Sequence, residues 1–575
     1  MEFTEKLLGL IGSPKDFYKT LNKIRTDNFK SKTEEFSGLL IELNTKYKID
    51  FCFLGFKAIS DDYDCWTIKR NIQSAFPEFK LKINTTLEFI KIAYEKGNCN
   101  LIDLITQLSA KQPKFISVLL EKLEGYNEPF IVDYISAIYI SLSKDDLSKI
   151  HSILINQVDD ISVYNQQGAI TALGSLDYSI DNKMVLLNKT IDKLTSIIEN
   201  KDSNLLKYIT IAFGHLLKYS NLIPDKLIEL KKMNINEINY QLAFILFKES
   251  KERCNEEWFK TLFILFVKTP DEHKAIIDYL DYVISDYIET KNYDFIIKFL
   301  SDWFLQGKRN VKKNEFKTQF GSTLNAILEN VELLEIIITT FFNEDNYQFH
   351  FIASQMLDYN NLYTKQEVRL NSKILSTLNF KDRVFICRKI IGYLYDTKTI
   401  CSLLFSFLEI TPLKKDTEKL IISFFLHLLA VNDPNDTQVF FETKIKNQML
   451  NKSQKHLCNK GIEIIQEQIN SLKELPRLKE FDLPQKYYYQ IQLEQSKEMR
   501  ESMEKVENKS VFLQSITKTP LKFGRGWFAF IEHIDDYSNI SYLSKISHSV
   551  SIPFSEISYP VHNSLLRFSF QLAKR

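Results

Sequence analysis

The sequence predicts a mainly α-helical protein in which short helices repeat along an extended array, an α-solenoid. Between Phe3 and Asn470 one amphipathic helical segment follows another, with only short polar breaks between them. Glycine is scarce, with 15 residues in 575 and none between Gly214 and Gly307. No Pro/Gly/Ser-rich linker divides the chain into ordinary domains. Because each unit of a repeat array packs on its neighbours, such a chain lengthens its core without separate domains.

The segment that begins at Pro129 shows the helical pattern most clearly. Apolar side chains recur there at i, i+3, i+4, i+7, i+8 and i+11, namely Ile131, Tyr134, Ile135, Ile138, Tyr139 and Leu142. This spacing gives a helix one buried face. A second helix is predicted after Ser143, because serine is a favourable N-cap and two aspartates follow in the first turn. Further helices are predicted up to residue 472, including one long helix over residues 318–342.

The spacing of these helices and a run of small residues indicate the type of repeat. Two successive helices span about 35–45 residues, the period of HEAT and armadillo repeats. The run Gln166-Gln-Gly-Ala-Ile-Thr-Ala-Leu-Gly-Ser-Leu resembles the second half of a HEAT-like unit, with weaker echoes at Ile211-Ala-Phe-Gly-His-Leu-Leu and Phe351-Ile-Ala-Ser-Gln-Met-Leu. The resemblance implies a right-handed HEAT-like helical-repeat solenoid over residues 81–472. It implies protein or nucleic-acid binding rather than one particular chemistry.

Three regions are predicted outside the array. Residues 1–80 are expected to be an irregular N-terminal capping region, in which residues 47–56 form a short strand or an aromatic plug. Residues 473–510 hold a two-proline connector and a long charged helix, with Glu501 four residues before Lys505. Residues 511–575 are expected to form a small β-rich module, since residues 527–531, 550–554 and 566–572 alternate with period two.

The overall charge gives no indication of a polyanionic partner. The chain carries 74 basic and 73 acidic side chains, a net charge of +1, so any contact with nucleic acid must be a local patch. The first residues lack the basic region and cleavage site of a signal peptide. The apolar runs are far shorter than the ~20 residues that span a bilayer. We therefore expect a cytoplasmic protein that makes no membrane contact.

The cysteines give no sign of a disulfide framework. There are seven, at positions 52, 65, 99, 254, 387, 401 and 458, and they are scattered without a C-x-x-C pair. This pattern fits neither paired disulfides nor a zinc ribbon. We expect them to be small buried apolar residues.

Familiar catalytic, metal and cofactor motifs are missing from the sequence. It has no phosphate-binding glycine loop, no H-E-x-x-H or G-x-S-x-G, no kinase signature and no EF-hand loop. His456 and Cys458, with Cys401 and His427 upstream, supply only one of the two tight pairs that zinc sites usually bring. No cofactor or metal is therefore predicted.

Two clusters remain as candidate contact sites in the array and the charged helix. One is a basic inter-helix connection, which carries Lys308, Arg309, Lys312, Lys313 and Lys317 against one acid. It could contact phosphates or an acidic partner, or be a solvated loop. The other is Tyr487-Tyr488-Tyr489 at the start of the charged helix. Since three consecutive side chains cannot all face one core, at least one is expected to be exposed or to contact a partner.

A third cluster falls in the expected β-rich module. His533 and Asp535, near Arg525 and Trp527, could support acid–base chemistry, or form an ordinary polar hairpin turn.

Three functions fit these observations. The leading hypothesis is a non-enzymatic scaffold or adaptor subunit of a larger complex, which binds a protein partner on the solenoid surface. The first alternative is a nucleic-acid-binding helical-repeat protein that uses the basic connection at 308–317. The second is an enzyme with a site in the C-terminal module. Tyrosines outside the core stripes could form the binding face of a scaffold, because tyrosine supplies a large contact area at low entropic cost.

Overall fold

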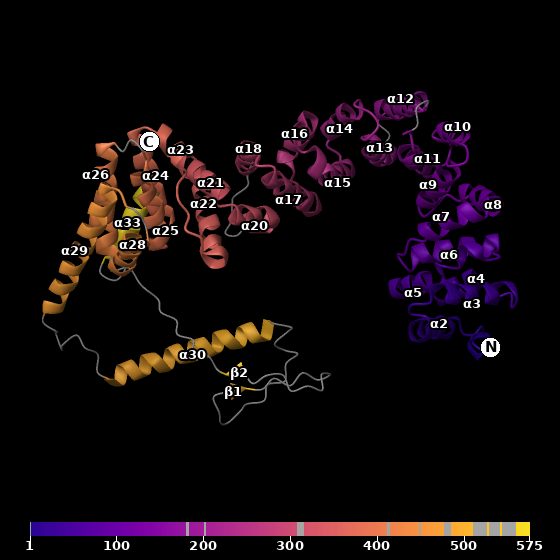
Figure 1. Cartoon of the computed structure of the whole chain (residues 1–575), viewed down its shortest axis with the longest axis horizontal. Coiled ribbons are helices and arrows are strands. Elements are labelled where there is room, and N and C mark those ends of the chain that lie inside the picture. Colours follow the sequence, from indigo (N-terminus) through magenta and orange to yellow (C-terminus); the bar gives the residue numbers. More distant parts are fainter. Residues whose placement is uncertain are drawn as a thin grey trace. The chain divides into compact units, whose positions relative to one another are not determined.

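A computed structural model describes residues 2–179, 183–200, 203–306, 315–410, 414–447, 450–475, 485–509, 526–527, 541–542 and 559–575. The chain divides into two compact units, Met1–Glu329 and Asn330–Arg575. Both are built from short helices packed in pairs (Figure 1). The prediction of a mainly helical protein is confirmed.

Unit 1 contains two rows of helices. In the first row each helix contacts the next member, and the row consists of α7 (Ile102–Lys111), α9 (Ile131–Leu142), α11 (Val163–Ser175), α13 (Ser203–Leu216), α15 (Asn236–Arg253), α17 (Lys274–Glu289) and α20 (Gly321–Glu329). The second row is made by the helices that alternate with these in the chain, namely α8 (Pro113–Glu124), α10 (Leu147–Gln157), α12 (Met184–Asn200), α14 (Ile223–Lys232), α16 (Glu257–Ile264) with the 3-10 turn η2 (Leu265–Lys268), and α18 (Tyr293–Leu305). The short α19 (Glu315–Gln319) precedes α20.

Polar contacts between neighbouring pairs reveal the repeat. The Tyr134 hydroxyl accepts from the Leu101 amide at 3.1 Å across 33 residues, and Lys193 pairs with Asp159 at 2.7 Å across 34. The buried Asp281 carboxylate accepts from the Ser322 and Thr323 amides, 41 and 42 residues away, and so caps α20. These separations are close to the predicted period of about 35–45 residues, and the packed helices are consistent with a helical-repeat fold.

Small residues set the spacing within the first row. A Cβ atom on Gly174 would lie 2.4 Å from the Ala212 Cα atom of the next row member, so α11 and α13 touch backbone to backbone. A Cβ on Gly214 would lie 2.8 Å from the Ile245 side chain on α15. The small-residue runs at 166–176 and 211–217 therefore lie where adjacent helices come closest.

The first residues of unit 1 are also helical. They form α1 (Glu2–Leu8), α2 (Pro14–Asn28), α3 (Thr33–Thr45), α4 (Phe51–Ala58), α5 (Asp62–Ile72), the 3-10 turn η1 (Phe76–Glu78) and α6 (Ile83–Glu95). The aromatic-rich segment forms α4 and no strand, because the Asp50 carboxylate caps this helix by accepting from the Phe53 amide at 2.9 Å. Phe51 then stacks on Phe79 at 4.7 Å in the core.

Unit 2 begins with a correction to the predicted helix over 318–342. Asn330 interrupts it, because its side chain accepts from the Leu333 amide and starts α21 (Val331–Asn343) after α20 has ended. The helices that follow are α22 (Tyr347–Tyr359) with the π-turn η3 (Asn360–Thr364), α23 (Ser372–Thr377), α24 (Phe380–Tyr393), α25 (Thr397–Phe405) with η4 (Ser406–Glu409), α26 (Lys415–Phe424) with η5 (Phe425–Leu429), α27 (Ala430–Asn432), α28 (Pro434–Asn447) and α29 (Lys452–Glu474). The charged helix is present as α30 (Gln485–Lys509).

The expected β-rich C-terminal module is wrong. In the part of 511–575 that the structure describes, strand pairing is limited to β1 (Gly526–Trp527) and β2 (Ser541–Tyr542), which pair antiparallel. The expected strand at 566–572 is instead largely within helix α33 (Pro560–Gln571), which packs on α24. Pro560 favours the first turn of a helix, and Arg567 and Gln571, four residues apart, both bond to α24 or the residue after it. The period-two pattern therefore misled because two of its polar members, Arg567 and Gln571, face the protein.

Candidate functional site

Five aromatic side chains gather on the outer surface of α15 and α17. Tyr279 contacts the rings of Tyr240, Phe244 and Phe247, each at 5.5 Å between ring centroids, and Phe247 also contacts Tyr282 at 5.6 Å. Four of the five are between 37% and 51% exposed. Clusters of exposed rings of this kind are unusual on a soluble surface and mark interaction sites.

The local sequence places these rings on the outside because α15 is apolar on both faces. Leu242, Ala243 and Leu246 are buried and hold the helix in the row, while positions 240, 244 and 247 repeat at i, i+4 and i+7 on the opposite side. The hydroxyls of Tyr240 and Tyr279 hydrogen-bond at 3.1 Å across the two helices. The Tyr240 and Tyr279 rings are therefore held together without a bound partner.

Three further tyrosines, Tyr94, Tyr164 and Tyr208, lie near one another on α6, α11 and α13. Burial raises the pKa of Tyr208 on α13, and Asp133, Tyr94 and Tyr164 lie close enough to add to that shift. We call the full set the aromatic face, and it comprises Tyr94, Tyr164, Tyr208, Tyr240, Phe244, Phe247, Tyr279 and Tyr282. Its rings come from α6 and from four successive members of the first row, α11, α13, α15 and α17, an arrangement that suits an extended partner.

Charges of both signs lie on the outward sides of the same helices. Lys207 on α13 and Lys248 on α15 supply positive charge, and Asp133 on α9, Glu237 on α15 and Asp278 on α17 supply negative charge. Burial raises the pKa of Asp133, while Lys207 opposes that shift. The aromatic face is therefore not a continuous basic track.

Unit 2 contains a groove of about 450 Å³. It lies between the residues that follow α22, the start of α25 and the middle of α28, and Glu367, Thr399 and Lys444 are among the residues that line it. Lys444 is 3% exposed, and its ammonium group lies 5.5 Å and 5.3 Å from the ring centroids of Phe405 and Phe440.

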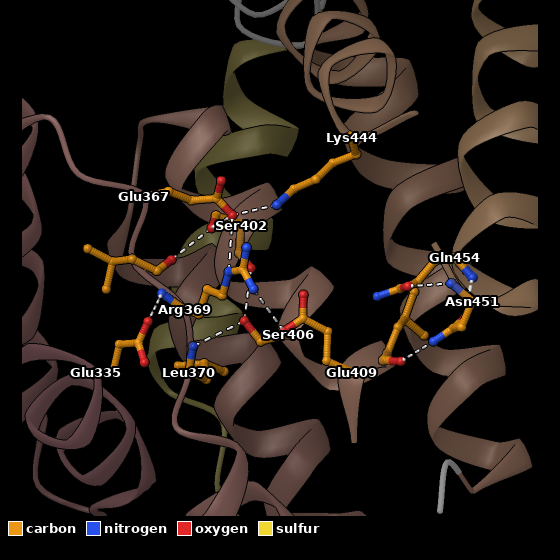
Figure 2. A network of polar contacts seen from close by, with 12 residues as sticks. Glu335, Glu367, Arg369, Leu370, Ser402, Ser406, Glu409, Lys444, Asn451 and Gln454 are labelled. Atoms are coloured by element: carbon orange, nitrogen blue, oxygen red, sulfur yellow. Dashed lines mark hydrogen bonds and ion pairs between the residues drawn. The ribbon is translucent and has the colours of Figure 1, made fainter. Parts of the chain in front are cut away.

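The Lys444 ammonium group is paired with Glu367, as Figure 2 shows. Burial alone would raise the pKa of Glu367, but the hydrogen bond and charge of Lys444, helped by Arg369, lower it. Arg369 also reaches Glu409 at 3.5 Å. Glu367 and Lys444 are 77 positions apart in sequence, about two repeats.

The rest of this network fixes the connection between α22 and α23. The Ser402 hydroxyl donates to the Val368 carbonyl at 2.8 Å, and the Leu370 amide donates to the Ser406 hydroxyl at 3.1 Å (Figure 2). Each of these polar groups has a partner within the protein. We therefore interpret the network, which we call the Lys444 clamp, as structural. It holds the connection between α22 and α23 against α25, η4 and α28.

The candidate residues from the sequence are not brought into one site by the described structure. Tyr487 and Tyr489 are 53% and 64% exposed on α30, as expected for at least one of the three tyrosines. Tyr488 belongs to the same helix, although its side chain is outside the description. Lys317 lies on α19, and Trp527 belongs to β1. The remaining candidates fall outside the described residues, namely Lys308, Arg309, Lys312, Lys313, Arg525, His533 and Asp535.

Two absences hold for the described part of the chain. Within it, no three His, Cys, Asp or Glu side chains are grouped so that they could hold a metal ion. No helix there is both long and apolar enough to cross a membrane.

Sequence reasoning missed the aromatic face and the Lys444 clamp. The spacing of Tyr240, Phe244 and Phe247 was a usable signal, since a helix with a second apolar stripe has more apolar surface than one core contact needs. No comparable signal existed for Lys444, whose partner is two repeats away.

Comparison with known proteins adds little. No family model matches the chain, and no curated protein matches it. Among solved structures it is similar to the crystal structure of an engineered protein, with 11% sequence identity, 81% of this chain and 99% of that chain covered, and a TM-score of 0.18. A TM-score this low supports no argument about fold or function.

Proposed function

We propose that this chain is a HEAT-like, right-handed helical-repeat scaffold or adaptor that binds a polypeptide segment of a protein partner along the aromatic face. The observation that carries the proposal is the set of linked, half-exposed rings on α15 and α17. Aromatic rings with polar tips are enriched among residues that dominate protein–protein binding energy. A cytoplasmic adaptor subunit also fits the seven free thiols.

A polypeptide suits this surface better than a nucleic acid. Bases stack well on exposed rings, but a single strand also needs a basic groove that follows its phosphates. The acids Asp133, Glu237 and Asp278 interrupt such a groove on the same helices. A peptide with apolar side chains flanked by charges of both signs complements the rings, the tyrosine hydroxyls and the mixed rim.

The test is a binding measurement with the full-length protein and a matched pair of variants. Partners captured from native extract, with and without nuclease, are identified and then purified, and their affinity is measured by calorimetry. The double variant Phe247→Ala, Tyr279→Ala is expected to weaken binding at least ~10-fold, because each ring is a central anchor. Tyr63→Ala is the control, since Tyr63 is 71% exposed on α5 away from the face.

Two results would contradict the proposal. One is equal affinity of the purified partner for the face variant and the Tyr63 control. The other is capture that nuclease abolishes, together with single-stranded RNA or DNA binding whose affinity falls steeply with salt. In that second case, replacing Lys308, Arg309, Lys312 and Lys313 by glutamine would test the nucleic-acid alternative.

A further inference from the structure

Two cysteines of unit 1 lie against each other although they are 34 positions apart in sequence. Cys65 is fully buried on α5, and Cys99 is half-buried in the connection between α6 and α7. The two thiols lie close enough for each to shift the pKa of the other. The backbone of the same connection also touches Cys65, because a Cβ atom on Gly97 would be 3.1 Å from the Cys65 sulfur.

The connection that carries Cys99 is held in place on both sides. The Cys99 amide donates to the Ala93 carbonyl at 3.0 Å, and Asn98 adopts a left-handed backbone with φ of 36°. On the other side Lys69, one turn after Cys65 on α5, donates to the Asn100 carbonyl at 2.8 Å and pairs with Asp103 at 2.9 Å. The two thiols are therefore kept together by the surrounding backbone.

The other cysteines have different surroundings. Cys52 accepts from the Thr86 hydroxyl at 3.7 Å, and Cys254 and Cys401 lie near Thr290 and Thr437. Cys387 and Cys458 are buried as well. The expectation that the cysteines are buried is confirmed for six of the seven, and Cys99 is the one with partial solvent access.

Electrostatics single out Cys99 as the reactive member of the pair. The hydrogen bond donated by Cys65 lowers the pKa of Cys99, and the Lys69 charge lowers it further, against the opposing effects of burial and Asp62. The pKa of Cys65 is raised, first by the same hydrogen bond and then by burial. Tyr134, from α9, is the other titratable group near the pair. A half-exposed thiolate beside a second thiol is the arrangement found in oxidation-sensitive cysteines.

We propose that Cys65 and Cys99 form a modification site at which hydrogen peroxide oxidises the two thiols to an intramolecular disulfide. The Cys99 thiolate attacks one peroxide oxygen, the O–O bond breaks, and hydroxide leaves and is protonated to water. Cys99 is then a sulfenic acid. The Cys65 sulfur loses its proton and attacks the Cys99 sulfur, and the S–O bond breaks to release a second water. Peroxide is reduced by two electrons, and the pair loses two hydrogen atoms.

The disulfide would link α5 to the entry of α7 within the first repeats of unit 1. It closes a loop between positions 65 and 99, which restricts the unfolded chain. This inference does not depend on the proposed binding function.

The experiment treats the full-length reduced protein with hydrogen peroxide at neutral pH, then alkylates the remaining thiols and maps them by mass spectrometry. The expected product is about 2 Da lighter, retains five alkylatable cysteines and contains a cross-linked peptide pair with Cys65 and Cys99. Cys65→Ser is expected to accumulate a sulfenic acid at Cys99 that dimedone traps. Cys99→Ser is expected to lose the fast reaction, and Lys69→Gln to slow it.

Cys254→Ser is the matched control, since it removes a buried thiol outside the pair and should leave the reaction unchanged. Circular dichroism of each variant establishes that it is folded. The proposal is overturned if folded wild-type protein keeps all seven thiols, or if Cys99 passes to the sulfinic acid with Cys65 still free. A disulfide that joins any other pair, or two protein molecules, overturns it equally.

Discussion

Two charged side chains of unit 2, Arg383 and Lys444, are buried and contact specific partners. Arg383 is 2% exposed and donates to the Thr417 hydroxyl at 3.0 Å and to the Leu375 carbonyl at 3.2 Å. Lys444 is held by Glu367 and two phenylalanine rings. Burial removes water from each of these charged groups. The cost of that desolvation is offset by the hydrogen bonds and ion pairs that the fold supplies.

His350 gives unit 2 a defined response to pH. The ring is fully buried, its Nε2 atom is 2.7 Å from the Glu344 carbonyl, and it lies against Phe342, Phe385 and Tyr393. The pKa of His350 is lowered from 6.5 to about 4, mainly by burial and also by the nearby Lys389, while the Glu344 carbonyl and Asp345 oppose the shift.

We therefore expect unit 2 to lose stability as pH falls from about 6.5 to about 4. A depressed folded pKa means that the unfolded chain binds the proton more readily, so the stabilisation is complete above pH 6.5 and is lost below it. The full effect is ~3 kcal/mol. Denaturant unfolding monitored at several pH values should show this decline, and His350→Asn should flatten it. The same substitution at the exposed His456 should leave the slope unchanged, and an equal slope in both variants would contradict the assignment.

At the scale of the element, the helices form where the sequence pattern places them, and their ends follow local caps. Asn330, Asn379 and Asn451 each begin a helix by accepting from the backbone amide three residues on. Local patterns misjudged the break at Asn330 in the helix predicted over 318–342, and they misjudged α33. Its alternation of apolar and polar residues fits a strand as well as a helix, and only the packing of Arg567 and Gln571 against α24 decides between them.

The close approach of α11 and α13 makes a prediction about one glycine. Gly174→Ala is expected to cost about 2 kcal/mol, because the new methyl group would meet the Ala212 backbone, which cannot move aside. Gly38→Ala is the control. Gly38 is exposed within α3 with nothing within 4 Å of the added methyl, so the same change should stabilise by ~0.5–1 kcal/mol. Chemical denaturation of both variants measures the difference, and two changes of the same sign would be inconsistent with this account.

At the scale of the molecule, the chain is a series of helices, and most contacts between them join residues about one repeat apart in sequence. In such arrays stability is approximately the sum of individual repeats and the interfaces between neighbours. The division into two compact units follows from the same locality, since each unit makes its own core.

This organisation predicts unfolding in more than one step. The two units should respond separately, so a substitution in one should leave amide hydrogen exchange in the other unchanged. Exchange measured by mass spectrometry on Gly174→Ala should accelerate in α11 and α13 and not in α24 or α25, with His350→Asn giving the reverse. Uniform acceleration across both units in either variant would show a single cooperative structure instead.

The sequence by itself determined the helical composition and the approximate repeat period. Those properties depend on residues that are neighbours within one or two turns, or on spacings that recur along the chain. Only the tertiary structure decided that Tyr240, Phe244 and Phe247 face outward to meet Tyr279 and Tyr282. It alone decided that Lys444 meets Glu367, and that Cys65 lies against Cys99. These pairings join positions one or two repeats apart, and their register depends on the packing of whole helices, which a local pattern does not encode.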